Sequence, residues 1–433
     1  MDQLTGKIEN WLADHRAELL EDLQTLMSFE SLDENTAARQ AALRFVLSRA
    51  REMGMRTGHT AEYDAGWAEI GSGSVTLGIL AHVDVVAVGD RANWATPPFA
   101  LTERDGWYCG RGIEDDKGPV IMSLYGLRAL RDLGVPLGKR LRLIVGTSEE
   151  TVWNDMAHYK RDFGMPDYSF SPDGGFPVFN IEKGYCDIVL RFSGPDLARL
   201  AAAEAGESPN SVPSSARYQL RGGEAQVFPG KAVHSSVPWL GDDPILKLGV
   251  RARDDGFAFG RFLCERFGGD FHGVRLGLDD GSDTCDGVFV GQTACAPTVL
   301  RFENGCVSIN LNIRYRAGLT RADIERAFGA LAAEYGYQAE IIECTPPMLV
   351  DPNQPFLQDM NTLLEKYGLP TGFQVAAGAS YSSTMRNCVS WGPVISDELS
   401  TAHMDNERLA VADFWKVMQL YIEYFVMEAE KSE

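Results

Sequence analysis

The sequence contains no apolar stretch long enough to span a bilayer, because its best candidate, residues 75–88, is interrupted by His82 and Asp84. Basic residues are scarce: 40 lysines and arginines stand against 61 acidic residues, which gives a formal net charge of −21. Such a balance argues against binding to nucleic acid or to an anionic membrane surface. We therefore expect no nucleic-acid partner and no membrane partner.

The chain also lacks closely paired cysteines. Its eight cysteines include no Cys-x-x-Cys pair and no spacing typical of a disulfide framework, so we expect them to be reduced, apolar core residues. Residues 1–27 place apolar side chains at helical spacing among many charges, which predicts an amphipathic helix and not a signal peptide. From these features we expect a cytoplasmic protein.

Hydrophobic patterning changes along the chain. Residues 75–83 and 141–146 are apolar runs that predict buried strands, and a helix is expected between them, from Pro119 to Gly134. From residue 185 onward apolar and polar residues alternate in several segments, which predicts antiparallel strands with one solvated face. Residues 203–226, rich in Gly, Ser, Pro and Glu, are expected to form a loop.

These patterns predict two domains, which suits a chain of 433 residues. The first is an α/β domain, with a central, mostly parallel sheet flanked by helices, over residues 1–184 and 347–433. The second is an inserted α+β domain with an antiparallel sheet, over residues 185–346.

Polar side chains stand where the predicted strands of the first domain end. His82 and Asp84 follow one strand, and since side chains alternate along a strand, both point to one face at its carboxyl end, where open α/β sheets bind ligands. Glu149 and Glu150 follow the next predicted strand. The full set of candidate groups is His82, Asp115, Glu149, Glu150, Asp173 and His403.

Two histidines and three of these carboxylates offer nitrogen and oxygen donors that suit a pair of divalent ions such as zinc or manganese. A shared carboxylate would hold two ions roughly 3.5 to 4 Å apart, and the remaining glutamate could take a proton from a water between them. Each group also has an ordinary structural explanation, as a hydrogen-bonded core histidine, a turn aspartate or an acidic helix start. Spacing alone leaves both interpretations open.

Five segments occur in a characteristic order. They are Ala81-His82-Val83-Asp84-Val85-Val86, Gly110-Arg111-Gly112 with Asp115-Asp116-Lys117-Gly118-Pro119, Gly146-Thr147-Ser148-Glu149-Glu150-Thr151, Ser171-Pro172-Asp173 and Thr401-Ala402-His403. Together they resemble the motifs of the M20 metallopeptidases over nearly the whole chain. The likeness is strongest to the bacterial dipeptidase V group, whose members cleave Xaa-Xaa and Xaa-His dipeptides.

This resemblance implies a metal-dependent dipeptidase with two zinc ions, or with manganese or cobalt in their place. His82 and Asp173 would hold one ion, Glu150 and His403 the other, and Asp115 would bridge them. Glu149 would act as general base and acid, and Asp84 would orient His82. The resemblance also implies a cis peptide between Asp115 and Asp116. An aspartate at position 173 is typical of relatives that act as dipeptidases, aminopeptidases or aminoacylases.

The resemblance assigns two further residues to the inserted domain, which would act as a lid. His234, within Gly230-Lys231-Ala232-Val233-His234-Ser235-Ser236, would stabilise the tetrahedral oxyanion, and Arg314 would bind the terminal carboxylate of the substrate. Ser383 stands where relatives usually carry a basic residue, which puts the specificity for substrate in question. A monomer is expected, with a homodimer as the alternative.

Two other functions share parts of this pattern. An N-acyl amino acid amidohydrolase would use the same metal ligands, and it would differ in not requiring a free α-amine on the substrate. A binding protein with an inactive site is disfavoured, because every expected ligand and Glu149 are present. We therefore expect hydrolysis of the amide bond of a short peptide with a free carboxylate, by a water between two divalent metal ions.

Overall fold

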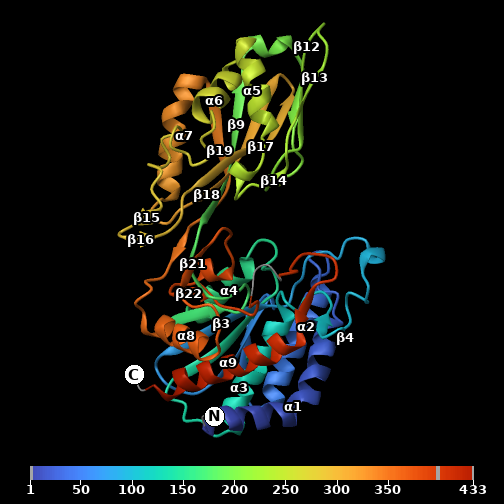
Figure 1. Ribbon diagram of the computed structural model, residues 1–433, viewed down its shortest axis with the longest axis vertical. Coiled ribbons are helices and arrows are strands. Elements are labelled where there is room, and N and C mark those ends of the chain that lie inside the picture. The colour runs from blue at the N-terminus through green and yellow to red at the C-terminus, as the bar shows by residue number, and fades with distance from the viewer. Residues whose placement is uncertain (1–2, 396–399, 432–433) are drawn as a thin grey trace. The chain divides into compact units, whose positions relative to one another are not determined.

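The computed structural model describes residues 3–395 and 400–431, which form two compact units (Figure 1). The first unit contains Met1–Asn180, Val350–Gln374 and Ser380–Glu433, and the second contains Ile181–Leu349 and Val375–Ala379. The sequence-based insertion, residues 185–346, does not include segment 375–379. This segment contains the end of β21 (Phe373–Ala376), which pairs with β8 (Val178–Glu182).

A mixed sheet with parallel central strands forms the first unit. Its strand order is β1-β2-β6-β3-β7-β22-β8-β20, where β20 is Met348–Leu349, and β21 pairs with β8 off this path. The strands are β1 (Arg56–His59), β2 (Ala65–Ile70), β6 (Arg140–Gly146), β3 (Thr76–His82), β7 (Tyr168–Ser171), β22 (Cys388–Ser390) and β8. Strands β6, β3, β7 and β22 are parallel, whereas β1, β2 and β8 pair antiparallel with their neighbours. The expected α/β class is confirmed, with antiparallel strands completing the edges of the sheet.

Strand β3 lies at the centre of this sheet, and all its side chains are buried. Burial of this kind is typical of a strand between two parallel neighbours with both faces covered. Helix α3 (Lys117–Asp132) packs against β3 and β6, and α1 (Gln3–Met27) and α9 (Val411–Glu430) lie side by side with it (Figure 1). Leu80 and Ile144 instead meet Met156 and Tyr159 of α4 (Asn154–Phe163). The remaining helices of the unit are α2 (Thr36–Glu52) and α8 (Pro355–Lys366).

A small separate sheet joins two loops of the first unit that are distant in sequence. Its order is β23-β5-β4, from Arg408–Ala410, Trp107–Cys109 and Thr102–Arg104. Because β23 and β5 are antiparallel, with Arg408 opposite Cys109, the residues just before Arg408 lie beside those just after Cys109.

The second unit is a seven-stranded antiparallel sheet in the order β13-β12-β10-β17-β18-β9-β19. The strands are β13 (Gln226–Pro229), β12 (Ser215–Leu220), β10 (Leu200–Ala205), β17 (Ala294–Glu303), β18 (Cys306–Tyr315), β9 (Gly184–Ser193) and β19 (Tyr337–Thr345). Helices α5 (Pro244–Asp254), α6 (Ala258–Arg266) and α7 (Arg321–Tyr335) share its apolar core. The short strands β11 (Ser211–Val212) and β14 (Val233–His234) form a separate pair.

The expectation of a loop over residues 203–226 is wrong. Strand β12 lies within this range and pairs with both β10 and β13. Ala216 and Tyr218 alternate into the core of the unit, so tertiary pairing overrides a composition that favours loops. None of the helices in the described ranges is both long enough and apolar enough to cross a bilayer.

Phe170 connects the sheet of the first unit to α9. Its ring is fully buried on β7, and it contacts the rings of Trp391, Tyr421 and Tyr424 at centroid distances of 5.5, 5.6 and 5.7 Å. We expect Phe170→Ala to destabilise the protein by about 3 to 5 kcal/mol, because loss of a buried ring leaves a cavity. Urea denaturation followed by circular dichroism measures this change.

Met165→Ala is the control for this prediction, because that side chain is 46% exposed in the same unit. We expect it to change the free energy of unfolding by less than about 0.5 kcal/mol. A Phe170→Ala variant as stable as this control would show that the aromatic cluster does not stabilise the unit.

Candidate metal centre

His82 is the last residue of β3, and its side chain is fully buried. Its Nδ1 lies 3.0 Å from the carbonyl oxygen of Asp84. Because a carbonyl can only accept, Nδ1 carries the proton, and the lone pair of the neutral ring is on Nε2. That atom lies 2.9 Å from Oδ1 of Asp115 and 3.7 Å from Oδ2 of Asp173. Burial acts to lower the pKa of His82, but hydrogen bonds to Asp115 and Asp173 outweigh it and raise that pKa well above its usual value. The neutral ring, with its lone pair facing the two carboxylates, is the form that a cation bound here would select.

Asp115 lies between the two histidines. Its other oxygen, Oδ2, is 3.0 Å from Nε2 of His403, which is also 3.1 Å from Oε2 of Glu150. The Asp115–Asp116 peptide is cis, as the resemblance implies. In addition, His82 donates its backbone N–H to Oδ2 of Asp116 at 3.0 Å.

The donor atoms form two groups, each with all its atoms within 4.8 Å of one another. One group is His82, Glu149 and Asp173, and the other is Asp115, Glu150 and His403. Register explains this convergence: His82 pairs with Gly146, so the ends of β3 and β6 lie together and the loop after β6 carries Glu149 and Glu150 to His82. The structure thus brings all six candidate groups of the first domain into one site.

The site holds more negative charge than its histidines can balance. Burial and the carboxylate of Asp173 raise the pKa of Glu149 well above its usual value. Burial likewise raises the pKa of Asp173, with Asp115 as the next cause. Hydrogen bonds to Asp115 and Glu150 raise the pKa of His403 to about 11. Burial acts to raise the pKa of Asp115 as well, but the two histidines outweigh it and lower that pKa.

Unpaired buried atoms show that a cation fits this site. Within the described residues, Oε1 of Glu150 is buried and has no hydrogen-bond partner, and the buried Nε2 of His82 and Oδ1 of Asp115, 2.9 Å apart, have no hydrogen-bond partner beyond each other. Buried polar atoms are normally satisfied, so each of these needs a ligand. Imidazole nitrogens and carboxylate oxygens are donors that zinc and manganese accept. The residues present therefore fit divalent metal ions.

Asp84 contacts two of the candidate groups. Its carbonyl accepts from His82, and its Oδ1 lies 3.3 Å from Nδ1 of the same ring. Its Oδ2 accepts the backbone N–H of Glu150 at 3.1 Å. Asp84 thus orients His82 mainly through its main chain, and its carboxylate also fixes the loop that carries Glu150.

Sequence reasoning missed two residues that organise the same loop. Oδ2 of the buried Asp155 accepts the backbone N–H groups of Thr147 at 2.7 Å and Ser148 at 3.0 Å. Tyr381 donates its hydroxyl to the same oxygen, and its ring stands 6.1 Å from that of His82. Asp155 lies in the first turn of α4, where acidic residues are common because they interact favourably with the helix dipole. No signal in the sequence distinguishes it.

Ser383, at the position where a basic residue is usual, closes the short turn η4 (Tyr381–Thr384). Its hydroxyl and its backbone N–H both donate to the carbonyl of Ser380, at 2.9 and 3.0 Å. A cation does reach this turn, because Lys160 donates its Nζ to the carbonyl of Thr384 at 2.8 Å.

In the second unit, His234 and Arg314 are connected through Asn312, which sequence reasoning also missed. Oδ1 of Asn312 accepts from Oγ of Ser235 at 2.9 Å and from Nε of Arg314 at 3.3 Å. The Arg314 guanidinium stands 4.5 Å from the centroid of the Tyr185 ring. Among the described residues Arg314 forms no ion pair within 4.0 Å, and the carboxylates of Asp187 and Glu343 act on its charge from a greater distance.

The protonation of His234 follows from its neighbours. Partial desolvation and the charge of Arg314 lower the pKa of His234, which favours the neutral ring at pH 7. The backbone N–H of Ser236 donates to Nδ1 at 3.2 Å. Nδ1 also lies 2.7 Å from Oγ of Ser236, whose hydroxyl can donate to it. When Nδ1 accepts from both groups of Ser236, the proton of the neutral ring lies on Nε2, which makes Nε2 a hydrogen-bond donor.

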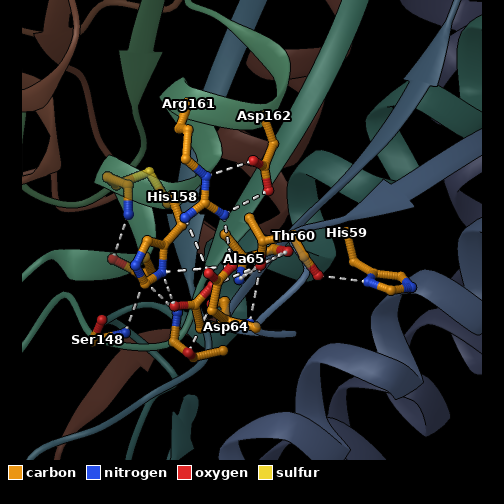
Figure 2. Close-up of polar contacts among 12 residues, drawn as sticks. His59, Thr60, Asp64, Ala65, Ser148, His158, Arg161 and Asp162 are labelled. Atoms are coloured by element: carbon orange, nitrogen blue, oxygen red, sulfur yellow. Dashed lines mark hydrogen bonds and ion pairs between the residues drawn. The ribbon is translucent and has the colours of Figure 1, made fainter.

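A third acidic group with a histidine has a different character. Glu62, Asp64 and His158 also bring donor atoms within 4.8 Å of one another. Figure 2 shows Arg161 among them, and it donates to both carboxylate oxygens of Glu62, at 3.0 and 2.8 Å. Oδ1 of Asp64 accepts from Thr60, and its Oδ2 lies 2.6 Å from Nδ1 of His158. Arg161 already supplies the cation here, so we interpret this group as a hydrogen-bonded network.

Known proteins share both the sequence pattern and the fold. The pattern of Peptidase family M20/M25/M40 matches residues 78–426. A protein of Bacillus subtilis (strain 168) named "Putative dipeptidase YtjP" is 27% identical over 463 residues, which cover 95% of this chain and 98% of that protein.

Two solved structures illustrate the shared fold. Human carnosine dipeptidase 1 has a TM-score of 0.64 at 14% identity, with 99% of both chains covered. The dipeptidase Dug1p from Saccharomyces cerevisiae has a TM-score of 0.65 at 14% identity, with all of both chains covered. At these identities the likeness concerns the fold alone.

Metal analysis tests whether His403 is a ligand. We expect the wild-type protein, stripped with a chelator and reloaded with Zn²⁺ or Mn²⁺, to bind two ions per chain by mass spectrometry of the metal. His403→Ala should lose one of them, because it removes a donor shared by Asp115 and Glu150. His158→Ala is the matched control, since it removes the histidine of the other acidic group and should leave the metal content unchanged. Equal metal content in both variants would exclude His403 as a ligand.

Proposed function

Since this chain belongs to Peptidase family M20/M25/M40, we propose that it is a metal-dependent dipeptidase that cleaves the amide bond of dipeptides with a free carboxylate. The observation that supports this function most is the convergence of the two donor groups on Asp115, with Glu149 in one of them. The match to relatives named as dipeptidases over almost the whole chain supports the class of substrate.

We propose two divalent ions, with zinc as the best-suited metal and manganese or cobalt as alternatives. His82 and Asp173 would hold one ion, Glu150 and His403 the other, and Asp115 both. When bound, the ions would polarise the scissile carbonyl and lower the pKa of the attacking water.

Glu149 is the residue that we propose to move the proton. Its carboxylate is poorly solvated, and its pKa is raised by burial and by Asp173, so it can both accept and release a proton. It would take a proton from the attacking water and pass it to the nitrogen of the leaving amine. Asp84 and Asp155 would keep the loop that carries Glu149 in place through the N–H groups of Glu150, Thr147 and Ser148.

The second unit would supply two contacts to the substrate. In the tautomer whose Nδ1 accepts from Ser236, Nε2–H of His234 would donate to the oxyanion of the tetrahedral intermediate. Arg314 would pair with the carboxylate of the substrate, and its planar fork suits two parallel hydrogen bonds. Asn312 would hold Arg314 and the segment after His234 together.

A comparison of substrates tests the proposed reaction. We expect the zinc- or manganese-loaded protein to release amine from unmodified dipeptides and to cleave their N-acetyl forms poorly. Glu149→Gln should lower kcat by about two to four orders of magnitude, because it removes the proton acceptor, and should keep the metal content of the wild type. Faster cleavage of N-acetyl amino acids than of dipeptides would instead identify an N-acyl amino acid amidohydrolase.

Arg314→Lys tests recognition of the substrate carboxylate. We expect KM for a dipeptide to rise about 10- to 100-fold, because a lysine cannot form the paired hydrogen bonds of the guanidinium, which are each worth about 1.5 to 3 kcal/mol to a charged group. The control is Arg191→Lys, on β9 of the same unit, where the arginine pairs with the exposed Glu340. Steady-state kinetics measure both variants, and an unchanged KM for Arg314→Lys would reject its role.

A further inference from the structure

We propose that Glu407 is a positioning residue for the metal centre: together with Glu114 it fixes Asp115 relative to His403. This inference rests on the proposed function, because it concerns how that dinuclear site is held. Neither glutamate reaches the reacting atoms, and both act through the backbone of the loops that carry the ligands. We define the two loops as residues 110–116, after β5, and residues 400–407, before β23.

Glu407 directs its carboxylate at the loop that carries Asp115. Its side chain is fully buried. Oε1 accepts the backbone N–H groups of Gly112 at 3.0 Å, Glu114 at 2.9 Å and Asp115 at 3.2 Å. Oε2 accepts the N–H of Gly112 as well, also at 3.0 Å. One side chain thus satisfies three donors of a loop that forms neither helix nor strand in that stretch.

A buried arginine balances the charge of Glu407. Nη1 of Arg111 donates to Oε2 at 2.7 Å, and Arg111 itself is 1% exposed. The guanidinium also stands 5.3 Å from the centroid of the Trp94 ring, which limits its movement. The carboxylate of Glu407 therefore binds the loop through both oxygens, and Oε2 also binds the guanidinium of Arg111.

Glu114 makes the reciprocal contact. Its Oε2 accepts the backbone N–H of Thr401 at 2.9 Å and the hydroxyl of Thr401 at 3.1 Å, and its Oε1 accepts from Oγ of Ser400 at 2.5 Å. Each loop therefore offers a glutamate to the backbone of the other. The pairing of β5 with β23 brings the loops together, and the N–H of Gly110 donates to the carbonyl of Glu407 at 2.9 Å.

His403 lies in the chain between Thr401, which Glu114 binds, and Glu407, and these contacts hold the backbone conformation of His403. Its φ is 64°, in the left-handed region that residues with a side chain rarely adopt. Such a conformation persists only where the surroundings determine it. On one side Thr401 is bound to Glu114 and, through its hydroxyl, to the N–H of Arg408 at 2.9 Å. On the other side Glu407 is bound to the loop of Asp115.

The geometry of the metal centre depends on these contacts of Glu407 and Glu114 between the two loops. The two oxygens of Asp115 face different histidines, so a shift of its loop would change the surroundings of both ions. Outer partners of metal ligands typically contribute about 10- to 100-fold in metal affinity. A purely structural ion pair would stabilise the fold without affecting the affinity for metal, and this difference can be measured.

The experiment compares Glu407→Gln with Glu428→Gln in the full-length protein. Glu428 is a suitable control because it is 1% exposed in the same unit and pairs with Lys139 at 3.0 Å, yet contacts none of the proposed ligands. Calorimetric titration of the metal-free proteins with Mn²⁺ gives the affinities, and electron paramagnetic resonance shows whether two bound Mn²⁺ ions are magnetically coupled. Thermal unfolding without metal reports on the fold.

We expect Glu407→Gln to bind Mn²⁺ about 10- to 100-fold more weakly and to lose the magnetic coupling. The loss follows because an amide has one acceptor end and one donor end, so in either orientation its NH2 group faces a donor, which is Arg111 or the N–H groups of the loop. Glu428→Gln should bind Mn²⁺ like the wild type, even if its melting temperature falls as far as that of Glu407→Gln. On a dipeptide, Glu407→Gln supplied with saturating metal should have a reduced kcat and a KM close to that of the wild type.

The outcomes separate this inference from the proposed function. A wild-type protein that binds no Mn²⁺ and cleaves no dipeptide would overturn the proposed function, and the inference with it. If the wild type binds two ions, and Glu407→Gln binds them as tightly and with the same coupling, the inference alone is wrong. Where Glu407→Gln does not fold, Glu114→Gln decides, because it leaves the pair of Arg111 and Glu407 intact and should weaken Mn²⁺ binding in the same way. Wild-type affinity in that variant would overturn the inference.

Discussion

Uncompensated negative charge inside the first unit is the constraint on which the site depends. Asp115, Glu149, Glu150 and Asp173 bring four carboxylates together in a poorly solvated space that contains two imidazoles. Isolated buried charges are costly, and they persist where a partner or a metal compensates them. The hydrogen bonds support the same conclusion, because Oε1 of Glu150 has no partner and Nε2 of His82 and Oδ1 of Asp115 have none beyond each other. Two divalent cations would satisfy the charge and the unpaired atoms together.

A parallel sheet is an efficient way to assemble such a site. The carboxyl ends of β3, β6 and β7 lie at one edge, so one edge receives His82, the pair Glu149 and Glu150, and Asp173. An antiparallel arrangement would send alternate strand ends to opposite edges. His403 and Asp115 do not follow strands of this sheet. They come from two loops that the pairing of β5 with β23 brings together. Glu407 and Glu114 each bind the backbone of the opposite loop, and these contacts fix the position of one loop relative to the other.

Much of this arrangement could be predicted from the sequence, because local signals carried it. The apolar run that ends in His82 predicted the central strand, and the motifs around His82, Asp115, Glu150 and His403 predicted which groups meet. The rest depends on contacts between distant segments. Tyr381, Asp155 and Asn312 are ordinary polar residues in sequence, and only the fold shows that they join loops. Strand β12 was missed for a related reason, since its composition favours a loop and its pairing with β10 decides the outcome.

Carboxylates hold the loops of this site, and their chemistry explains why. A carboxylate has about four acceptor positions, so one side chain can gather several N–H groups of an irregular loop, which a lysine or an arginine cannot do. Glu407 and Asp155 act in this way, and Asp84 accepts one N–H, that of Glu150. Each of these carboxylates, when ionised, adds negative charge near a centre that already has an excess, and burial raises the pKa of Glu407 to about 7. Arg111 offsets this at Glu407, and the fully buried Lys117 donates to the carbonyl of Phe29 at 2.6 Å close by. Burial lowers the pKa of Lys117 to about 7, so its positive charge is only partly held near neutral pH. The carboxylates that order the loops therefore also add negative charge that a bound cation would compensate. For this reason the positions of the ligands and the affinity for metal depend on the same side chains.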